Sequence, residues 1–414
     1  MTWRDIALGS AIHVKHGFAF KGEYFADHGE YIVLTPGNFN EEGGFRVRPE
    51  KERYYASDIP ESYVLDEGDL IVAMTEQGAG LLGSAALVPQ AKRYLHNQRL
   101  GLVDQIDTAL LDKKFLYLLF NTRSVRAQIS GSASGTKVRH TAPERIYRVS
   151  VRVPDIPTQF QIAETVLAYD DLIENNRRRM ALLEESARLL YREWFVRLRF
   201  PGYEHTRITD GVPTGWRKVT VGQITSKIGS GFTPRGGESA YLAEGTPLIR
   251  SMNVYDDQFD EAGLAFISDE QALSLAGVTV ESKDILLNIT GASVARCCMA
   301  PERYMPARVN QHVMIVRVDR KKADPFFVHK AINSDERKRQ LLSFAQKGST
   351  REALTKEMVG RFEIILPTKV LMRQFGEIAG AIFRQRETLA RQNQKLRAAR
   401  DLLLPRLMSG EIAV

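Results

Sequence analysis

Apolar and polar residues alternate in two distinct ways along the 414-residue chain. Apolar residues step by alternating fours and threes from Ile162 to Trp194, which is the heptad pattern of a long paired helix. "KKFLYLLFNTRSVRAQI" (113–129) predicts short helices. Elsewhere a period of two predicts half-buried strands, for example "YIVL" (31–34), "GLVDQI" (101–106) and "YRVSVRV" (147–153).

These patterns occur twice, at a nearly constant offset of 213 residues. Trp3-Arg4 recurs as Trp216-Arg217, and "EGDLIVAMT" (67–75) matches "SKDILLNIT" (282–290). The first long helix is expected to begin near Pro157, where Thr158-Gln-Phe-Gln161 has the spacing of a capping box. The second copy carries a matching heptad run from Phe375 to Leu407. A repeat of this length indicates two similar units, each followed by a long helix.

We therefore predict an α+β protein with two repeated domains that mix strands and short helices. Because the copies follow one another in the chain, we expect the two long helices to pair antiparallel and to relate the domains by a pseudo-twofold axis. A helix of about 35 residues spans roughly 50 Å, or one to one and a half turns of B-DNA. The predicted segments are 1–153 (domain 1), 154–199 (central helix), 200–215 (linker), 216–366 (domain 2) and 367–414 (C-terminal helix and tail).

A glycine pattern raises the question of nucleotide binding. Gly78-x-Gly80-x-x-Gly83 has the spacing of a dinucleotide-binding loop, but such a loop must open a helix whose first N–H groups bind the pyrophosphate. Here "SAALVP" (84–89) has a proline as its sixth residue, and the second copy, "ITGASVARCCMAP", lacks the pattern. The glycines are predicted to serve a hairpin turn instead.

Composition favours an acidic partner. There are 57 Lys and Arg against 50 Asp and Glu, which gives a formal charge of +7 and is typical of contact with nucleic acid. Cys297 and Cys298 are adjacent, so we expect them to be buried thiols in a reducing compartment. No stretch approaches eighteen uncharged apolar residues, so we expect a cytoplasmic protein without a membrane partner.

The layout and several segments resemble the specificity subunits of type I restriction–modification systems. The resemblance covers essentially the whole chain and is carried by "VPDIPTQFQIAETVLAYDDLIENN" (153–176), "LLYREWFVRLRF" (189–200), "VPTGW" (212–216) and "LLLPRLMSGEI" (402–412). It implies a non-catalytic subunit that reads a split sequence in double-stranded DNA, one half per target-recognition domain. It further implies two methyltransferase (modification) subunits docked on the helices, with restriction subunits joining that core. S-adenosylmethionine, ATP and Mg²⁺ are then expected on the partner subunits, and no cofactor or metal on this chain.

Basic and polar residues in loops are the candidates for DNA contact, because Lys and Arg bind phosphates and Gln or Asn bind base edges. The loops "SGTKVRH" (134–140) and "QKGSTRE" (346–352) come first, followed by the hairpin tips, which include Glu76, and by positions shared between the copies. Shared residues are equally consistent with supporting the fold. The candidates are Lys15, Gln77, Gln98, Lys137, Arg139, His140, Lys227, Ser293, Arg296, Gln311, Lys347, Ser349 and Arg351. Apolar residues expected to dock a partner subunit are Leu182, Trp194 and Phe195.

Two other classes of protein remain possible from the residues. A self-contained adenine methyltransferase or restriction enzyme needs a clamp such as Asp-Pro-Pro-Tyr to hold a flipped base. The nearest string, Asp324-Pro325-Phe326-Phe327, lacks the second proline and is better explained as a helix start. The other class is a coiled-coil scaffold with two binding modules, which would show no salt-dependent binding to duplex DNA.

Overall fold

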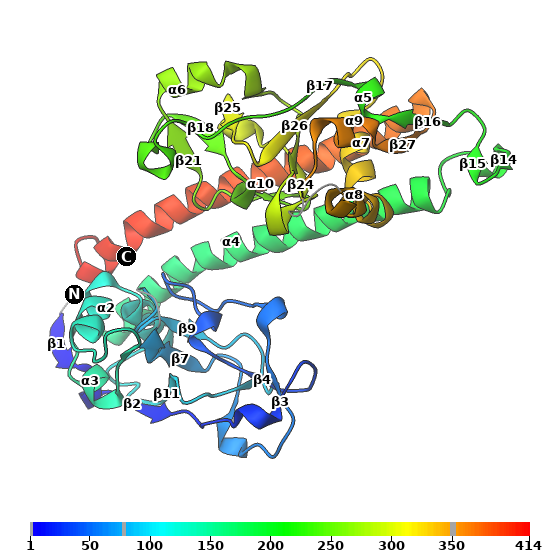
Figure 1. Cartoon of the computed structure of the whole chain (residues 1–414). Helices are drawn as coiled ribbons and strands as arrows, with labels where there is room; N and C mark the ends of the chain where they lie inside the picture. The colour runs from blue at the N-terminus through cyan, green and yellow to red at the C-terminus, as the bar shows by residue number, and fades with distance from the viewer. Residues whose placement is uncertain (1–2, 77–79, 348–352) are drawn as a thin grey trace. The chain divides into compact units, whose positions relative to one another are not determined.

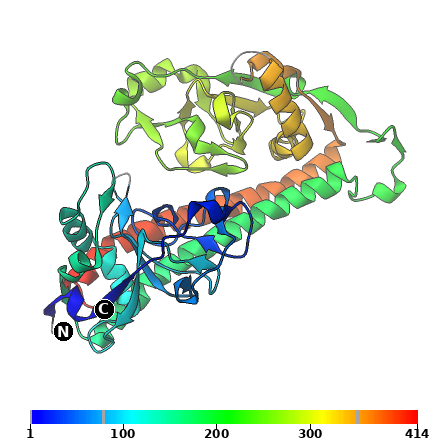
Figure 2. The same cartoon turned by 60° about the horizontal axis from the view of Figure 1, so that its bottom comes forward.

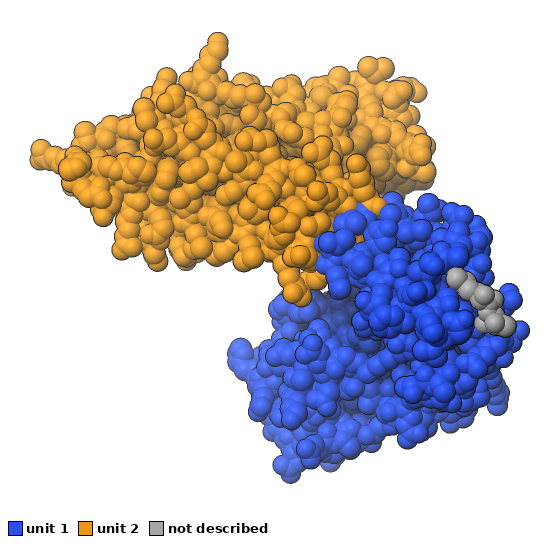
Figure 3. All heavy atoms as spheres, turned by 180° about the vertical axis from the view of Figure 1, so that it is seen from behind, with its two compact units in different colours: residues 1–172, 396–414 blue, residues 173–395 orange. Residues whose placement is uncertain are grey.

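The computed structural model describes residues 3–76, 80–347 and 353–414 and separates the chain into two compact units. Unit 1 spans residues 1–172 and 396–414, and unit 2 spans 173–395 (Figure 3). Each unit therefore contains a mixed body of strands and short helices together with a segment of both long helices. The division differs from the predicted segments, because it cuts across each long helix instead of setting the helices apart.

The body of unit 1 is built on a four-stranded antiparallel sheet with the order β2-β11-β7-β9. Its inner strand β7 is buried along its whole length, as its continuous "LIVA" sequence requires. A second sheet, β3-β5-β4-β10-β6, contains one parallel pair, β4 with β10. The strands are β2 (Ile12–His16), β3 (Phe25–Ala26), β4 (Ile32–Val33), β5 (Tyr54–Tyr55), β6 (Val64–Leu65), β7 (Leu70–Ala73), β9 (Ala85–Leu87), β10 (Tyr94–Leu95) and β11 (Leu100–Ile106).

Short helices follow the central sheet of unit 1. The predicted helical stretch is divided into α1 (Lys113–Phe120) and α2 (Arg123–Gly131), because the Asp112 and Thr122 side chains each cap the helix that follows them. The helix α3 (Pro143–Tyr147) begins on a proline. A two-stranded sheet, β1 (Arg4–Ala7) with β13 (Ser150–Val153), then joins the two ends of the body.

Unit 2 repeats this plan. Its central sheet has the order β17-β26-β23-β24, again antiparallel throughout, and its second sheet, β21-β18-β25-β22, has one parallel pair, β18 with β25. Helices α7 and α8 occupy the places of α1 and α2. The elements are β17 (Thr225–Ser230), β18 (Thr246–Ile249), β19 (Val254–Tyr255), β20 (Gln258–Phe259), β21 (Ala265–Ile267), β22 (Thr279–Val280), β23 (Ile285–Asn288), β24 (Cys297–Met299), β25 (Ala307–Val309), β26 (Val313–Val318), α5 (Val221–Ile224), α6 (Asp269–Ser274), α7 (Pro325–Asn333), α8 (Asp335–Lys347) and α9 (Lys356–Arg361), with a hairpin of β14 (Ile208–Thr209) and β15 (Val212–Pro213) before them.

Strand register confirms the repeat residue by residue. In unit 1, Arg4 pairs with Val153. In unit 2, β16 (Arg217–Thr220) pairs with β27 (Glu363–Leu366), and Arg217 pairs with Leu366. Both partners are displaced by 213 residues, so the offset read from the sequence is also the offset of the backbone pairing.

The two long helices are α4 (Ile156–Tyr191), which continues into a π-helical turn at Arg192–Val196, and α10 (Lys369–Ser409). Their first residues are again 213 apart. The capping-box prediction at Thr158 is wrong by one turn: Asp155 caps the helix, and its Oδ1 accepts a hydrogen bond from the Thr158 N–H at 2.9 Å. Hydrogen bonds from Thr158 lower the pKa of the Asp155 carboxyl, and Pro157 is tolerated because the first turn lacks N–H partners.

Side-chain contacts along the long helices show that they pair antiparallel. In unit 1, Asp170 Oδ1 and Arg400 Nη1 are 2.5 Å apart. In unit 2, Asn176 Nδ2 donates to Asn393 Oδ1 at 2.9 Å, and Glu184 forms an ion pair with Arg386. Residue numbers rise along α4 as they fall along α10, and Figures 1 and 2 both show the helices lying side by side.

Each core is completed by the far end of the other copy's helix. In unit 1, Leu407 and Met408 of α10 are buried with Ile162 of α4. In unit 2, Tyr191, Trp194 and Phe195 at the end of α4 pack against the core that includes Phe375 of α10. The apolar endings of the two long helices therefore fill cores, which explains why "LLYREWF" and "LLLPRLM" are rich in large apolar residues.

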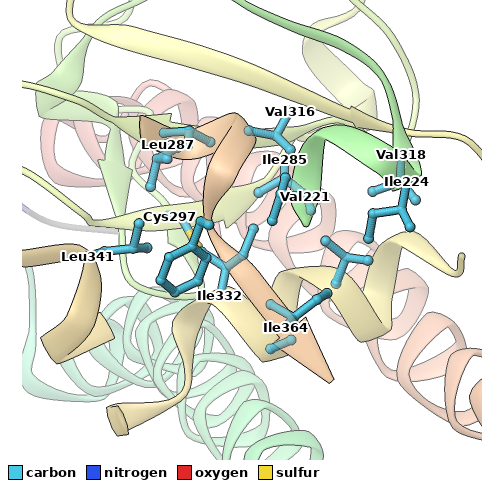
Figure 4. Packing of buried hydrophobic residues seen from close by; sticks show 14 of the residues in the cluster. Val221, Ile224, Ile285, Leu287, Cys297, Val316, Val318, Ile332, Leu341 and Ile364 are labelled. Carbon is cyan, nitrogen blue, oxygen red and sulfur yellow. The ribbon is translucent and has the colours of Figure 1, made fainter. Parts of the chain in front are cut away.

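The central sheet of unit 2 packs its apolar side chains against the short helices. Figure 4 shows Val221, Ile285, Val316 and Ile364 converging with Cys297 in this cluster. Cys297 and Cys298 are free thiols and both are buried, as expected, and burial raises the pKa of both thiols. Among the described residues, every helix is too short or too polar to cross a membrane.

Candidate nucleic-acid interface

The glycine-bearing loop of unit 1 joins two strands, as predicted. β7 pairs antiparallel with β9, and Val72 lies opposite Ala85. Gly80 and Gly83 adopt left-handed φ values of 115° and 78°, which glycine reaches without steric cost. Gly78 and the candidate Gln77 lie outside the described residues. The loop therefore turns a hairpin, and no helix follows it.

The amides of this loop hold a carboxylate that belongs to the chain itself. Oε2 of Glu76 accepts hydrogen bonds from the N–H groups of Gly80, Leu81 and Leu82 at 3.1, 3.0 and 2.9 Å. Glu76 is only 4% exposed, so its carboxylate depends on these donors in place of water. The prediction that Glu76 contacts DNA is wrong, because its side chain is buried and accepts hydrogen bonds from the amides of the hairpin tip.

The same carboxylate joins the tip to the predicted loop 134–140. β8 (Thr75–Glu76) pairs with β12 (Arg139–His140), with Arg139 opposite Glu76. Arg139 Nη1 lies 3.2 Å from Glu76 Oε1, and its other terminal nitrogen donates to the Ser130 carbonyl. The structure thus brings together two segments that the sequence selected separately. Within this cluster the guanidinium of Arg139 is held by protein groups, whereas Lys137 and His140 are exposed.

A further cation supports the tip and was missed at the sequence level. Arg126 of α2 donates through Nε to the Leu82 carbonyl at 2.9 Å and through Nη1 to the Glu41 carbonyl at 3.1 Å, and it also bonds the Gly80 carbonyl. Burial lowers the pKa of the Arg126 guanidinium. An arginine inside an amphipathic helix carries no local signal of this role, because its partners are backbone carbonyls distant in sequence.

Unit 2 brings the equivalent segments together. Thr290, at the start of its hairpin tip, forms a β-bridge with Ala353, and the Leu354 N–H donates to the Ile289 carbonyl at 2.8 Å. In the tip, Ser293 ends a 3₁₀ turn (Gly291–Ser293). The guanidinium of Arg296 lies 4.9 Å from the ring centroid of Tyr255. Of the remaining candidates, Lys347 is the last residue of α8, and Ser349 and Arg351 lie outside the described residues.

The candidate lysines shared by the two copies are held by their own units. Lys15 donates to the Ser62 carbonyl at 2.7 Å and lies 4.5 Å above the Tyr63 ring. Lys227 donates to the Gly277 carbonyl in the same way. Both are only partly exposed. Matching positions in the two copies therefore perform the same internal task, which favours a role in the fold.

The shared Asn-Gln pairs divide between two roles. The Asn97 side chain accepts from the Arg99 N–H at 3.0 Å and Asn310 accepts from the His312 N–H at 3.1 Å, so both buried asparagines build the same turn. Gln98 is exposed. In contrast, Gln311 accepts from the Thr233 hydroxyl at 2.5 Å and its Nε2 contacts the His312 ring at 3.0 Å, so its amide is already engaged.

Comparisons with known proteins agree on one family. Residues 1–185 match the family described as the type I restriction modification DNA specificity domain. The MjaIX specificity subunit of Methanocaldococcus jannaschii is 24% identical over 310 residues, which cover 73% of this chain and 69% of that protein. The HindI specificity subunit of Haemophilus influenzae is 22% identical over 363 residues, which cover 72% of this chain and 77% of that protein.

Residues 1–185 match the specificity domain, and the chain is similar to type I restriction–modification specificity subunits over most of its length. The solved S subunit of a type I restriction–modification system from M. genitalium has the same fold, with a TM-score of 0.63 at 15% identity and coverage of 98% of this chain and 96% of that one. The MjaIX and HindI relatives are both named as specificity subunits of type I restriction enzymes.

The string that resembled a base clamp has a structural role in unit 2. Asp324 Oδ1 accepts hydrogen bonds from the N–H groups of Phe326 and Phe327 at 2.9 and 3.1 Å, and thereby caps α7, with Pro325 in its first turn. This confirms the helix-start interpretation. Among the residues that the structure describes, no cluster of three or more His, Cys, Asp or Glu side chains could hold a metal ion.

The residues predicted to dock a partner subunit fall into two environments. Leu182 on α4 is 68% exposed, as a docking residue would be. Phe195 instead lies 4.9 Å from Phe327 and 5.2 Å from Phe375, and Trp194 lies 6.3 Å from Phe375 (ring centroids). These two aromatic side chains therefore pack inside unit 2, and docking through them stays a prediction.

Proposed function

We propose that units 1 and 2 each read one half of a split sequence in double-stranded DNA. The observation that carries the proposal is the duplicated sheet with two different tips. Both central sheets present a hairpin tip beside a second loop, yet the tip runs from Ala73 to Ala85 in unit 1 and only from Asn288 to Cys297 in unit 2. A shared scaffold with unequal loops suits two different half-sites, because base edges are read by loop side chains in the major groove.

Within each unit, polar residues near the tip that are exposed or partly exposed are the proposed DNA contacts. In unit 1 these are Lys137 and His140 in the loop beside the tip, together with the exposed Gln98. In unit 2 they are Ser293 and Arg296, which lie on the shorter tip. Lysine contributes affinity through phosphates, whereas glutamine and arginine distinguish base pairs.

We further propose that α4 and α10 set the spacer between the half-sites and dock two modification subunits. The antiparallel contacts and the 36 and 41 residues of these helices support a spacer of fixed length. At 1.5 Å per residue, α4 alone is about 54 Å long. The exposed Leu182 is the proposed contact for one partner.

Cofactors belong, in this proposal, to the partners. S-adenosylmethionine accompanies the modification subunits that methylate adenine, and ATP and Mg²⁺ accompany the restriction subunits. The Glu76 carboxylate supports this assignment, because it already occupies the loop amides that a nucleotide phosphate would need. S-adenosylmethionine should leave the melting temperature of the isolated chain unchanged. A rise would favour a cofactor site on this chain.

Mapping methylated adenines in DNA from cells that carry the complete system tests the proposed function. Two short specific blocks separated by a fixed run of unread bases are expected, because each unit reads one block. A single continuous block would contradict the proposal. A scaffold with two protein-binding modules would produce no methylated motif that depends on this chain, and no salt-dependent binding to duplex DNA.

A further inference from the structure

A basic pocket in unit 2 lies where α7 and α10 begin. It is a cavity of about 360 Å³ that also borders the turn between β22 and β23. Apolar atoms of Ala323, Pro325, Val370 and Met372 form part of its wall. The cations that line the basic pocket are Lys283, Arg320, Lys321, Lys322, Lys369 and Arg373.

The charge of the basic pocket is one-sided. Asp324 is the single acidic residue in the lining, and its carboxylate is directed to the first N–H groups of α7. Burial raises the pKa of that carboxyl. With Asp324 ionised the lining carries five net positive charges, against a formal charge of +7 for the whole chain. Most of the excess positive charge of the chain therefore gathers here.

The repeat provides an internal control for these cations. The turn after β26 has the same backbone hydrogen bond as the turn after β11. The Lys322 N–H donates to the Asp319 backbone carbonyl, as the Leu110 N–H donates to the Asp107 backbone carbonyl. α10 and α4 also begin at matching residues. The unit 1 counterparts of Lys283, Arg320, Lys321, Lys322, Lys369 and Arg373 are Gly68, Thr108, Ala109, Leu110, Ile156 and Phe160. All six counterparts are uncharged, so the fold does not require the cations.

Lys283 adds a second, conformational observation. Its φ of 69° lies in the left-handed region, as does the 78° of its counterpart Gly68. Both residues lie in the same kind of turn before the buried strand of their unit. In these turns the Asp284 N–H donates to the Glu281 backbone carbonyl, and the Asp69 N–H donates to the Asp66 backbone carbonyl. Glycine adopts this conformation freely, whereas a lysine is strained in it. A lysine is thus present at the rim of the pocket despite a backbone that suits glycine.

Several of these cations remain available to a ligand. Lys321, Lys369 and Arg373 are exposed, and within the described part of the chain Arg373 has only a 4.0 Å contact to the exposed Glu377. Arg320 and Lys322 donate to the backbone carbonyls of Ser282 and Gln223, each at 3.0 Å, which fixes their stems beside the cavity. These carbonyl contacts do not neutralise either charge, although Lys322 Nζ also lies 3.7 Å from a carboxylate oxygen of Asp319.

We propose that the basic pocket binds phosphate groups of the DNA backbone, as a contact of unit 2 that unit 1 lacks. This inference rests on the proposed function. β23 runs from the turn that holds Lys283 to the hairpin tip, so the basic pocket lies at the opposite end of the strand from the candidate base contacts. The basic pocket therefore supplies affinity that does not depend on the DNA sequence. The phosphates that it binds are different from those next to the bases that the tip reads.

The test is the salt dependence of duplex binding by the complete complex of this chain with its modification subunits. The variant Lys321→Ala/Lys369→Ala/Arg373→Ala removes three exposed cations from the basic pocket. The control Arg207→Ala/Arg217→Ala/Arg339→Ala removes three exposed cations elsewhere on unit 2. Each lost phosphate contact should reduce the slope of log K against log salt by about 0.9. We expect a reduction of about 2 to 3 for the pocket variant only, with the methylated sequence unchanged.

Three results separate the possibilities. An equal slope for the pocket variant and the control would overturn the inference. Weaker assembly with the modification subunits at an unchanged slope would also overturn it and would assign the pocket to an acidic protein surface. Absence of salt-dependent duplex binding by the unaltered complex would instead contradict the proposed function itself.

Discussion

At the residue scale, Glu76 shows what a sequence pattern can and cannot reveal. The glycine spacing, compared with the second copy, predicted a hairpin turn, and the structure confirms it. The pattern could not reveal that a buried carboxylate holds three amides of that turn and pairs with Arg139, because those contacts depend on tertiary folding. The polar residues at a loop tip look alike in sequence, whether they face inward or outward.

Replacing Glu76 by Gln should loosen the tip. The amide keeps one acceptor but loses the charge that binds Arg139 and the three N–H groups, and hydrogen bonds to charged groups contribute about 1.5–3 kcal/mol. Hydrogen exchange at Gly80, Leu81 and Leu82 should accelerate about tenfold or more. The matched control is Glu144→Gln, an exposed residue of the same unit. Equal exchange rates in the two variants would show that Glu76 does not hold the tip.

His96 makes the stability of unit 1 depend on pH. It is fully buried and bonds the Leu100 carbonyl at 2.9 Å, and burial, as the largest cause, lowers its pKa to about 4. In the unfolded chain its pKa is about 6.5. Between these values the unfolded state binds a proton that the folded state does not, so stability is lost as the pH falls from about 6.5 toward 4.

The variant His96→Gln keeps a hydrogen-bond donor and removes this titration. Hydrogen exchange of core amides in unit 1, compared between pH 7 and pH 4.5, should show about 2–3 kcal/mol less acid destabilisation in His96→Gln than in the unaltered chain. His28→Gln, at an exposed position of unit 1, is the control and should behave like the unaltered chain. The same acid loss in all three proteins would argue against a neutral buried His96.

At the scale of elements, the sequence predicted where the long helices begin better than it predicted what their ends contact. The heptad steps and the offset of 213 gave the helix starts to within a turn, because both are local patterns. On the first long helix, the sequence predicts that Leu182, Trp194 and Phe195 dock a partner subunit. Phe195 also packs against the core of unit 2, as Leu407 packs in the core of unit 1. A heptad pattern alone does not distinguish a core contact from an external interface, so docking through Phe195 stays a prediction.

The buried pair Asn176 and Asn393 should fix the register of the helices. Asn393 is 2% exposed, and its Nδ2 also donates to the Ile173 carbonyl at 3.1 Å. Asn393→Leu should destabilise the helix pair by about 1–3 kcal/mol, because the amide of Asn176 then lacks its partner. Adding Asn176→Leu should recover much of the lost stability. Hydrogen exchange of helix amides in a double-mutant cycle measures the coupling, and additive effects would count against a specifying role.

At the scale of the whole molecule, the proposed spacer can be lengthened without altering either body. Asn176 faces Asn393, so exposed Arg178 lies close to the level of exposed Arg391 on the partner helix. Inserting one heptad after each of these two residues preserves the seam and adds about 10 Å to the helix pair. At 3.4 Å per base pair, the mapped spacer should grow by about three base pairs with both half-sites unchanged. An unchanged spacer would show that the helices do not set it.

The separate reading of two half-sites by two homologous units is the central claim, and the exchange of one unit's body tests it most directly. Residues 1–153 would be replaced by the equivalent segment of a related type I specificity subunit, and methylated adenines would be mapped in cells that carry the complete system. The account predicts that one half of the methylated sequence changes while the other half and the spacer stay the same. A change in both halves, or in neither, would contradict it.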